Sequence, residues 1–281
     1  TVNTDMEKKP YHHLPDGTFR NPEGSPISRS SSGKFSYRDF NKEKKTDERK
    51  VQKDQEKNNQ QVLNNLEKFK NGELVTPKKQ IVYYIDRATP VKWRKYLKQG
   101  IEDWQIAFEE AGFKNAIIAK DPPTKEEDPE WSPEDVRYSV VRYLASPIPN
   151  ANGPHVSDPR SGEILESDIN WYHNVMTLLR NWFFVQTAAI NEDARGVSFD
   201  DEVMGRLIRF VSAHEVGHTI GLPHNMGSSS AYPVDSLRSA TFTKKYGTAP
   251  SIMDYARWNY VAQPGDEGVA LMPSYWDTPN I

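Results

Sequence analysis

The chain has 281 residues, of which 36% are hydrophobic and 27% charged, and 36 basic against 39 acidic residues give a net charge of −3. No window approaches the roughly 18 consecutive apolar residues of a membrane-spanning helix. A near-neutral total argues against a dedicated nucleic-acid binder, which would show a basic excess. The chain has no cysteine, and this excludes disulfides, thiolate nucleophiles and cysteine-ligated zinc.

The first 77 residues differ in composition from the rest of the chain. They carry a net charge of +3, whereas residues 78–281 carry −6. Turn-forming residues dominate 15–33, and residues 46–71 combine many charges with a narrow apolar stripe at helical spacing, which Gly72 ends. We therefore predict that residues 1–77 are a charged N-terminal arm containing one solvated helix and no core of its own.

Residues 78–281 have the pattern of a folded domain. A buried strand is expected at 81–85 and a helix from Pro90 to Gly112. The further expected elements are strands at 116–119, 138–144 and 163–171, and helices at 175–190 and 201–220. This order predicts an α+β fold, with a mixed sheet and helices packed on one face. Residues 121–133, 145–162 and 228–250 read as loops, and the last of these lacks any convincing element.

The expected helix at 201–220 carries the most informative motif, HEVGHTIGLPH at residues 214–224. His214 and His218 are four residues apart, so both imidazoles lie on one helical face and can reach one ion. Gly221 can take a positive φ, end the helix and reverse the chain, which returns His224 as a third ligand. Three protein ligands leave a fourth position open, as in catalytic zinc sites. Glu215 can face that position, and a purely structural site would have no use for it.

A second motif, Ser251-Ile252-Met253-Asp254-Tyr255, places Met253 29 residues after His224. A long His-Glu motif followed by such a Met-turn is the metzincin signature. The chain therefore resembles the metzincin zinc endopeptidases, over roughly residues 78–272. The resemblance implies a metzincin-like twisted mixed sheet with an active-site helix. It also implies an upper sheet subdomain at 78–221 and an irregular lower subdomain at 222–281. Met253 would form the apolar floor beneath zinc, and Tyr255 would bind zinc or stabilise an oxyanion.

Other stretches are similar to one branch of these enzymes, the zinc-metalloprotease domain of large gut-bacterial proteins. They are His224–Gly227, Asp158–Leu165 and Pro250–Tyr255. Family likeness and the length of the chain favour the metalloprotease A subunit of a cholera-like toxin, with a pentameric lectin-like B subunit as partner. The Gly- and Pro-rich tail 264–281 departs from the long C-terminal helix with which many A subunits enter their pentamer.

We therefore expect a zinc-dependent endopeptidase with Zn²⁺ as its cofactor and a peptide or protein as its substrate. A bacterial secreted location is expected, because the chain begins at Thr1 without an apolar signal-like stretch, as a processed protein or an expressed segment would. The alternatives are a free-standing secreted metalloprotease and, from another class, a non-enzymatic zinc-binding scaffold or adhesin. Two finer hypotheses are a substrate-subsite role for His155 and a protease-sensitive lid formed by residues 228–250, in place of a simple covering loop.

Overall fold

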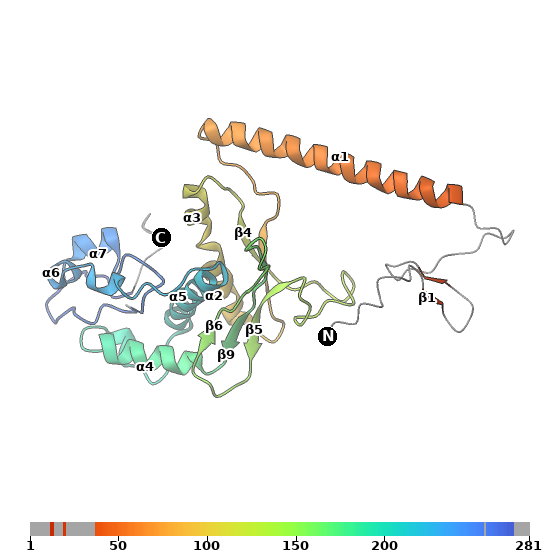
Figure 1. The fold of residues 1–281 in the computed structure, drawn as a ribbon. Coiled ribbons are helices and arrows are strands. Elements are labelled where there is room, and N and C mark those ends of the chain that lie inside the picture. Colours follow the sequence, from red (N-terminus) through yellow and green to blue (C-terminus); the bar gives the residue numbers. More distant parts are fainter. Residues whose placement is uncertain (1–11, 14–18, 21–36, 256, 273–281) are drawn as a thin grey trace, which may run out of the picture. The chain divides into compact units, whose positions relative to one another are not determined.

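The computed structural model describes residues 12–13, 19–20, 37–255 and 257–272, with side chains from residue 49 onwards (Figure 1). The chain divides into two compact units, Thr1–Glu67 and Lys68–Ile281. The predicted domain boundary after residue 77 stays a prediction. Most of the turns expected at 15–33, and the last part of the 264–281 tail, lie outside the described residues.

The first unit contains a short hairpin and most of one long helix. The hairpin pairs β1 (His12–His13) with β2 (Phe19–Arg20), and the helix is α1 (Tyr37–Lys70). The helix expected at 46–71 is confirmed, and it begins nine residues earlier because residues 37–45 contain no glycine or proline to stop it. Its apolar stripe remains exposed, with Val62, Leu66 and Phe69 all more than half accessible.

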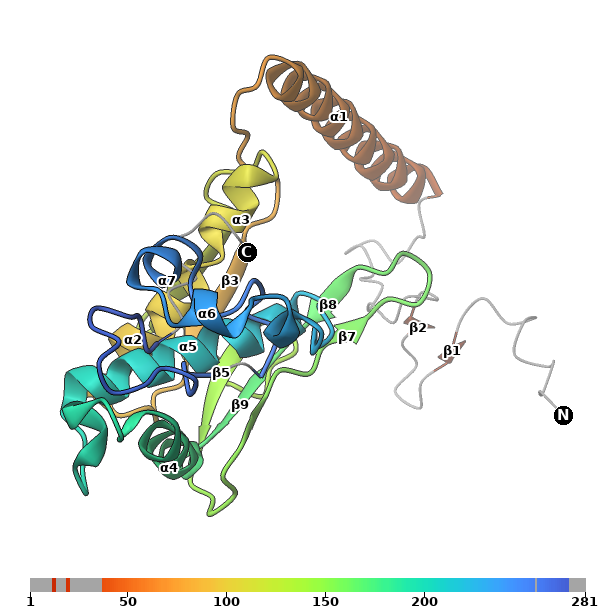
Figure 2. The same cartoon turned by 90° about the vertical axis from the view of Figure 1, so that its left-hand side faces the viewer.

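The second unit is built on a five-stranded sheet with the order β4-β3-β5-β9-β6. The strands are β3 (Ile81–Ile85), β4 (Ile117–Lys120), β5 (Ser139–Leu144), β6 (Ala151–Asn152) and β9 (Ile169–Tyr172). Four are parallel, and β6 runs antiparallel to β9 at one edge, with Ala151 opposite Trp171. The expected mixed sheet is confirmed. β7 (Val156–Ser157) and β8 (Ile164–Glu166) form a separate hairpin, seen clearly in Figure 2.

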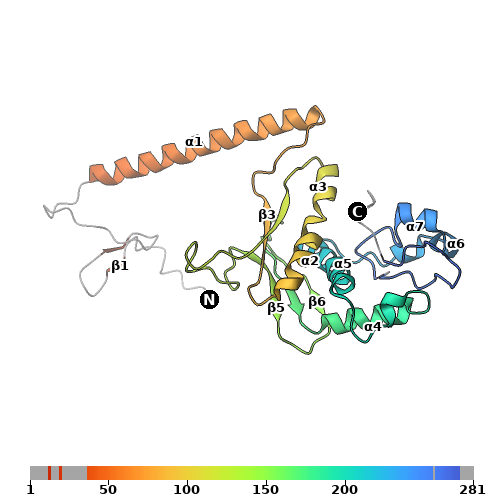
Figure 3. The same ribbon diagram turned by 180° about the vertical axis from the view of Figure 1, so that it is seen from behind.

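Helices α2 (Val91–Glu102) and α5 (Asp201–Thr219) pack against the sheet and against each other, and α4 (Val175–Thr187) lies beside them (Figure 3). α2 and α5 cross closely at Gly100, where an added Cβ would lie 2.5 Å from the Arg209 carbonyl oxygen. The core between the layers combines side chains from the sheet with side chains from both helices: Tyr83, Ile85, Val141, Ile169, Trp171, Leu97, Ile101, Leu207, Ile208 and Val216. The α+β, metzincin-like fold class is thus confirmed.

Two expected elements are each divided in the structure. The single helix expected from Pro90 to Gly112 is two helices, α2 and α3 (Gln105–Glu110). Between them, Asp103 accepts a 2.7 Å hydrogen bond from the Arg209 guanidinium, and Trp104 Nε1 donates to the Ala213 carbonyl at 2.8 Å. The strand expected at 163–171 becomes β8 and β9, because Asp168 between them accepts a hydrogen bond from the Val140 amide.

The segment after α5 is short helices joined by irregular chain. These are α6 (Val234–Leu237) and α7 (Ala240–Tyr246), preceded by a 3₁₀ turn at Ser228–Ser230. Another 3₁₀ turn, at Glu192–Arg195, lies before α5. The expectation that residues 228–250 lack elements is therefore wrong. None of the described helices combines the length and the apolar character needed to cross a bilayer.

Side-chain bonds fasten this segment to the C-terminal stretch that follows it. Asn259 Nδ2 donates to the Leu237 carbonyl at 2.7 Å, and Arg238 pairs with Asp266 at 2.8 Å. Thr243 is fully buried and accepts a hydrogen bond from the Ala270 amide. These contacts favour a packed covering segment over a mobile lid.

We expect limited trypsin digestion to cut α1 before it cuts residues 228–250. The basic residues of α1 that the structure describes lie on an exposed helix, whereas Arg238, Lys244 and Lys245 lie in or beside packed helices, and cleavage there requires local unfolding. Mass spectrometry of early fragments would give the order of cutting. A first cut at one of these three residues, with rising peptidase activity, would restore the lid hypothesis.

Candidate metal centre

Helix α5 positions three of the residues singled out in the sequence: His214, Glu215 and His218. It begins at the N-cap Asp200, whose side chain accepts from the Glu202 amide, and acidic residues fill its first turn. It ends at Thr219, and Gly221, two residues later, has a φ of 96° and an amide that donates to the His218 carbonyl. The predicted helix stop at Gly221 is confirmed, and the reversed chain carries His224 back towards the helix.

The three histidines His214, His218 and His224 form one cluster. Each offers a ring nitrogen, and these atoms all lie within 4.8 Å of one another. Nε2 of His218 lies 3.1 Å from Nε2 of His224. The His214 ring centroid is 4.9 Å from that of His218 and 5.4 Å from that of His224. The spacing of the motif therefore brings all three side chains to one point.

Backbone carbonyls fix which nitrogen of two of these rings faces the cluster. His214 Nδ1 lies 2.6 Å from the Ile252 carbonyl oxygen, and His218 Nδ1 lies 2.9 Å from that of Leu222. Because a carbonyl only accepts, each Nδ1 carries the hydrogen, and each Nε2 keeps its lone pair for a ligand. Burial lowers the pKa of His214 to about 4, so this imidazole is neutral at pH 7 and need not release a proton to bind a metal. This donor set fits zinc.

Glu215 follows the first histidine of the cluster on α5 and is only 7% exposed. No hydrogen bond to its carboxylate occurs among the described residues, and burial raises its pKa to about 7. A buried carboxyl group without a protein partner is costly unless a ligand or a reaction uses it. Glu215 thus has the burial and proton affinity of a group that exchanges protons near neutral pH.

The Met-turn packs beneath α5. Met253 is 4% exposed, and a Cβ added to Gly217 would lie 2.1 Å from its sulfur atom, so only glycine leaves room for Met253 between the turns that carry His214 and His218. The Met253 carbonyl accepts from the Asn225 amide at 2.8 Å, next to His224. The turn therefore holds both segments that carry the histidines.

Tyr255 lies against the histidine cluster and remains half exposed. Its ring centroid is 4.5 Å from that of His224 and 5.6 Å from that of His214. Asp254 sets this position, since its buried carboxylate accepts from the Tyr255 amide at 2.6 Å and from Ser228 Oγ at 2.6 Å. No role for Asp254 is predicted from the sequence, although a carboxylate inside an apolar turn motif indicates that it binds nearby backbone groups.

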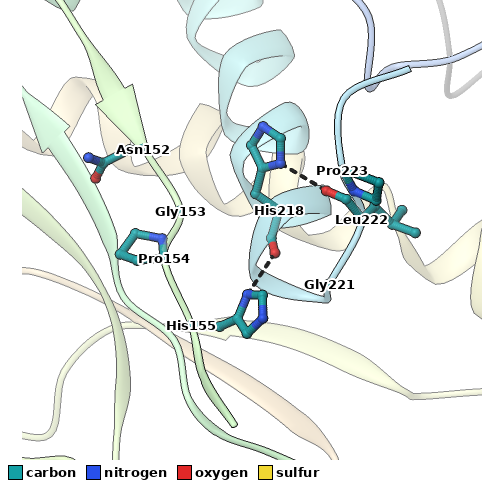
Figure 4. A pocket seen from close by; sticks show the side chains of 8 residues that line it. All are labelled: Asn152, Gly153, Pro154, His155, His218, Gly221, Leu222 and Pro223. Carbon is teal, nitrogen blue, oxygen red and sulfur yellow. Dashed lines mark hydrogen bonds between the residues drawn. The ribbon is translucent and has the colours of Figure 1, made fainter. Parts of the chain in front are cut away.

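His155 lies outside the cluster, in the wall of a hollow next to it (Figure 4). Its Nδ1 is 3.2 Å from the His218 carbonyl oxygen. The hollow has a volume of about 540 Å³ and lies between residues 152–155, at the end of edge strand β6, and the end of α5. His155 is therefore placed where a substrate subsite role is feasible, and that role stays a prediction.

Comparison with known proteins adds one finding. Residues 196–281 match a family model described as Met-zincin. This match spans α5, His224 and the Met-turn, and together with the histidine cluster it supports a zinc metalloprotease of the metzincin type. No curated protein and no solved structure matches the chain.

Proposed function

We propose that this protein is a zinc-dependent endopeptidase that hydrolyses peptide bonds. The observation that carries the proposal is the convergence of three imidazoles together with the buried Glu215, which follows His214 in the chain and has no hydrogen-bond partner for its carboxylate among the described residues. A structural zinc site is closed by four protein ligands, whereas three ligands leave a position for a reacting molecule. A non-enzymatic scaffold would have no need for a buried carboxyl group there.

Each residue of the candidate site has a separate role in the proposed peptide hydrolysis. His214, His218 and His224 would hold the ion, and the Ile252 and Leu222 carbonyls orient two of the rings. When bound, zinc would supply Lewis acidity and would make a water molecule acidic enough to lose a proton at about pH 7. The Glu215 carboxylate takes the proton from the attacking water and gives it to the leaving amine. The Tyr255 phenol donates a hydrogen bond to the developing oxyanion.

Metal removal tests the proposal directly. A zinc chelator should abolish hydrolysis of casein or of a quenched fluorescent peptide, and stoichiometric zinc should restore it, because the proposed reaction requires the ion. A zinc-loaded chain that cleaves neither substrate would favour the scaffold alternative. Hydrolysis that survives complete metal removal, measured by elemental analysis, would contradict the zinc mechanism.

Secretion and a pentameric lectin-like partner stay proposals, supported by the likeness noted in the sequence. A small lectin-like protein that co-purifies from the native source would support the toxin assembly. Activity in a secreted fraction without such a partner would favour a free-standing metalloprotease.

A further inference from the structure

Arg257 lies just beyond the Met-turn and has an unusual backbone conformation. Its φ is 50°, and Asn115 is the other non-glycine residue of the described chain with a positive φ. Arginine rarely adopts this left-handed conformation, so the surrounding structure must hold it there. Trp258, the next residue, provides that anchor: it is 1% exposed, its amide donates to Gln186 Oε1, and its ring packs on Phe183 of α4.

The Arg257 side chain is stacked on aromatic rings. Its guanidinium carbon lies 3.2 Å from the ring centroid of Trp182 on α4 and 5.1 Å from that of Tyr255. The Tyr255 ring in turn contacts His224, at 4.5 Å between centroids. A continuous series of rings thus connects the guanidinium to the histidine cluster.

The charge of Arg257 has no acceptor in the described part of the chain. Arg137, Arg142 and Arg238 each pair with a carboxylate. Arg257 forms no hydrogen bond or ion pair with any described residue, although it is half-buried and burial lowers its pKa. A partly desolvated cation without an anionic partner is disfavoured, and stacking on Trp182 offsets only part of this cost.

We propose that Arg257 is a specificity-determining residue that binds a carboxylate of the peptide substrate beside the metal centre. The Trp182 ring stacks on the guanidinium, whereas the N–H groups lie in the guanidinium plane and can donate two parallel hydrogen bonds to a carboxylate. The carboxylate belongs either to an Asp or Glu side chain or to the C-terminus of the peptide. The inference rests on the proposed peptidase function.

The test measures kcat/KM of the zinc-loaded full chain on matched fluorescent peptides. In the first arm, pairs of peptides carry either Glu or Gln at each position that flanks the cleaved bond in turn. In the second arm, a peptide with a free C-terminal carboxylate is compared with the same peptide ending in an amide. The wild type should prefer the charged member of one arm by about 10-fold or more, mainly through KM. Arg257→Gln should bring that ratio close to one, whereas Arg257→Lys should retain part of it because the charge remains.

Arg206→Gln, at an exposed position on α5, is the matched control and should retain the wild-type ratio. A preference in the first arm identifies a side-chain carboxylate, and one in the second identifies the chain terminus. A wild type that cleaves peptides without either preference overturns the role of Arg257, as does an Arg257→Gln variant that retains the preference. A wild type that cleaves no peptide overturns the proposed function itself.

Discussion

Replacing Glu215 with glutamine should lower kcat/KM for peptide hydrolysis by about 10²-fold or more while the chain keeps its zinc. The three imidazoles remain in place, but the amide cannot take a proton from the attacking water. Activity on a fluorescent peptide and zinc content by elemental analysis would be measured on the same preparation. A variant that cleaves at the wild-type rate would contradict the role of Glu215 as the base.

The fold should tolerate this substitution. Burial raises the pKa of Glu215 to about 7, above the ordinary value of 4.5, so in the metal-free chain its ionisation reduces stability as the pH rises between these values. The neutral amide has no such cost, and metal-free Glu215→Gln should unfold at a temperature at least as high as the wild type at pH 8. Glu192→Gln, at an exposed 3₁₀ turn, is the matched control and should leave activity unchanged.

Replacing His224 with alanine should reduce zinc content well below one ion per chain and abolish hydrolysis. His214 and His218 remain on α5, but a two-histidine site lacks the third ligand that such centres use. Elemental analysis after dialysis against a weak chelator would give the stoichiometry. His173→Ala is a suitable control, because His173 bonds to the Tyr143 hydroxyl and not to the cluster. Unchanged zinc in His224→Ala would show that His224 is not a ligand.

The sequence predicted best those features that depend on local spacing. The separation of His214 and His218, and the reversal at Gly221, follow from helix geometry and backbone freedom within eight residues. The division of the expected helix into α2 and α3 at Trp104 does not follow from local geometry, because it depends on a hydrogen bond to Ala213, more than a hundred residues away. In the same way, α6 and α7 are too short to show periodicity and depend on contacts with residues 259–270.

The residues of the candidate site also differ in how well the sequence predicts their roles. The three candidate metal ligands and Glu215 are recognisable from residue type and spacing. Asp254 and Arg257 become meaningful only once tertiary structure places Ser228 and Trp182 next to them. The partners of the Asp254 carboxylate and of the Arg257 guanidinium lie far away in the sequence, so the neighbouring residues in the chain do not specify them.

The bonds between the Met-turn and the two segments that carry the histidines imply that the 214–224 motif alone would be a poorer metal binder than the whole chain. A fragment ending before residue 252 would contain all three histidines, yet it would lack the carbonyl that orients His214 and the carbonyl that holds Asn225. Without them, either nitrogen of His214 could face the metal. The loop that carries His224 would become ordered only when the ion binds, and the loss of conformational entropy would weaken binding. The motif at 214–224 thus provides the three candidate ligands, and the Met-turn, with Met253 29 residues after His224, preorganises two of the segments that carry them.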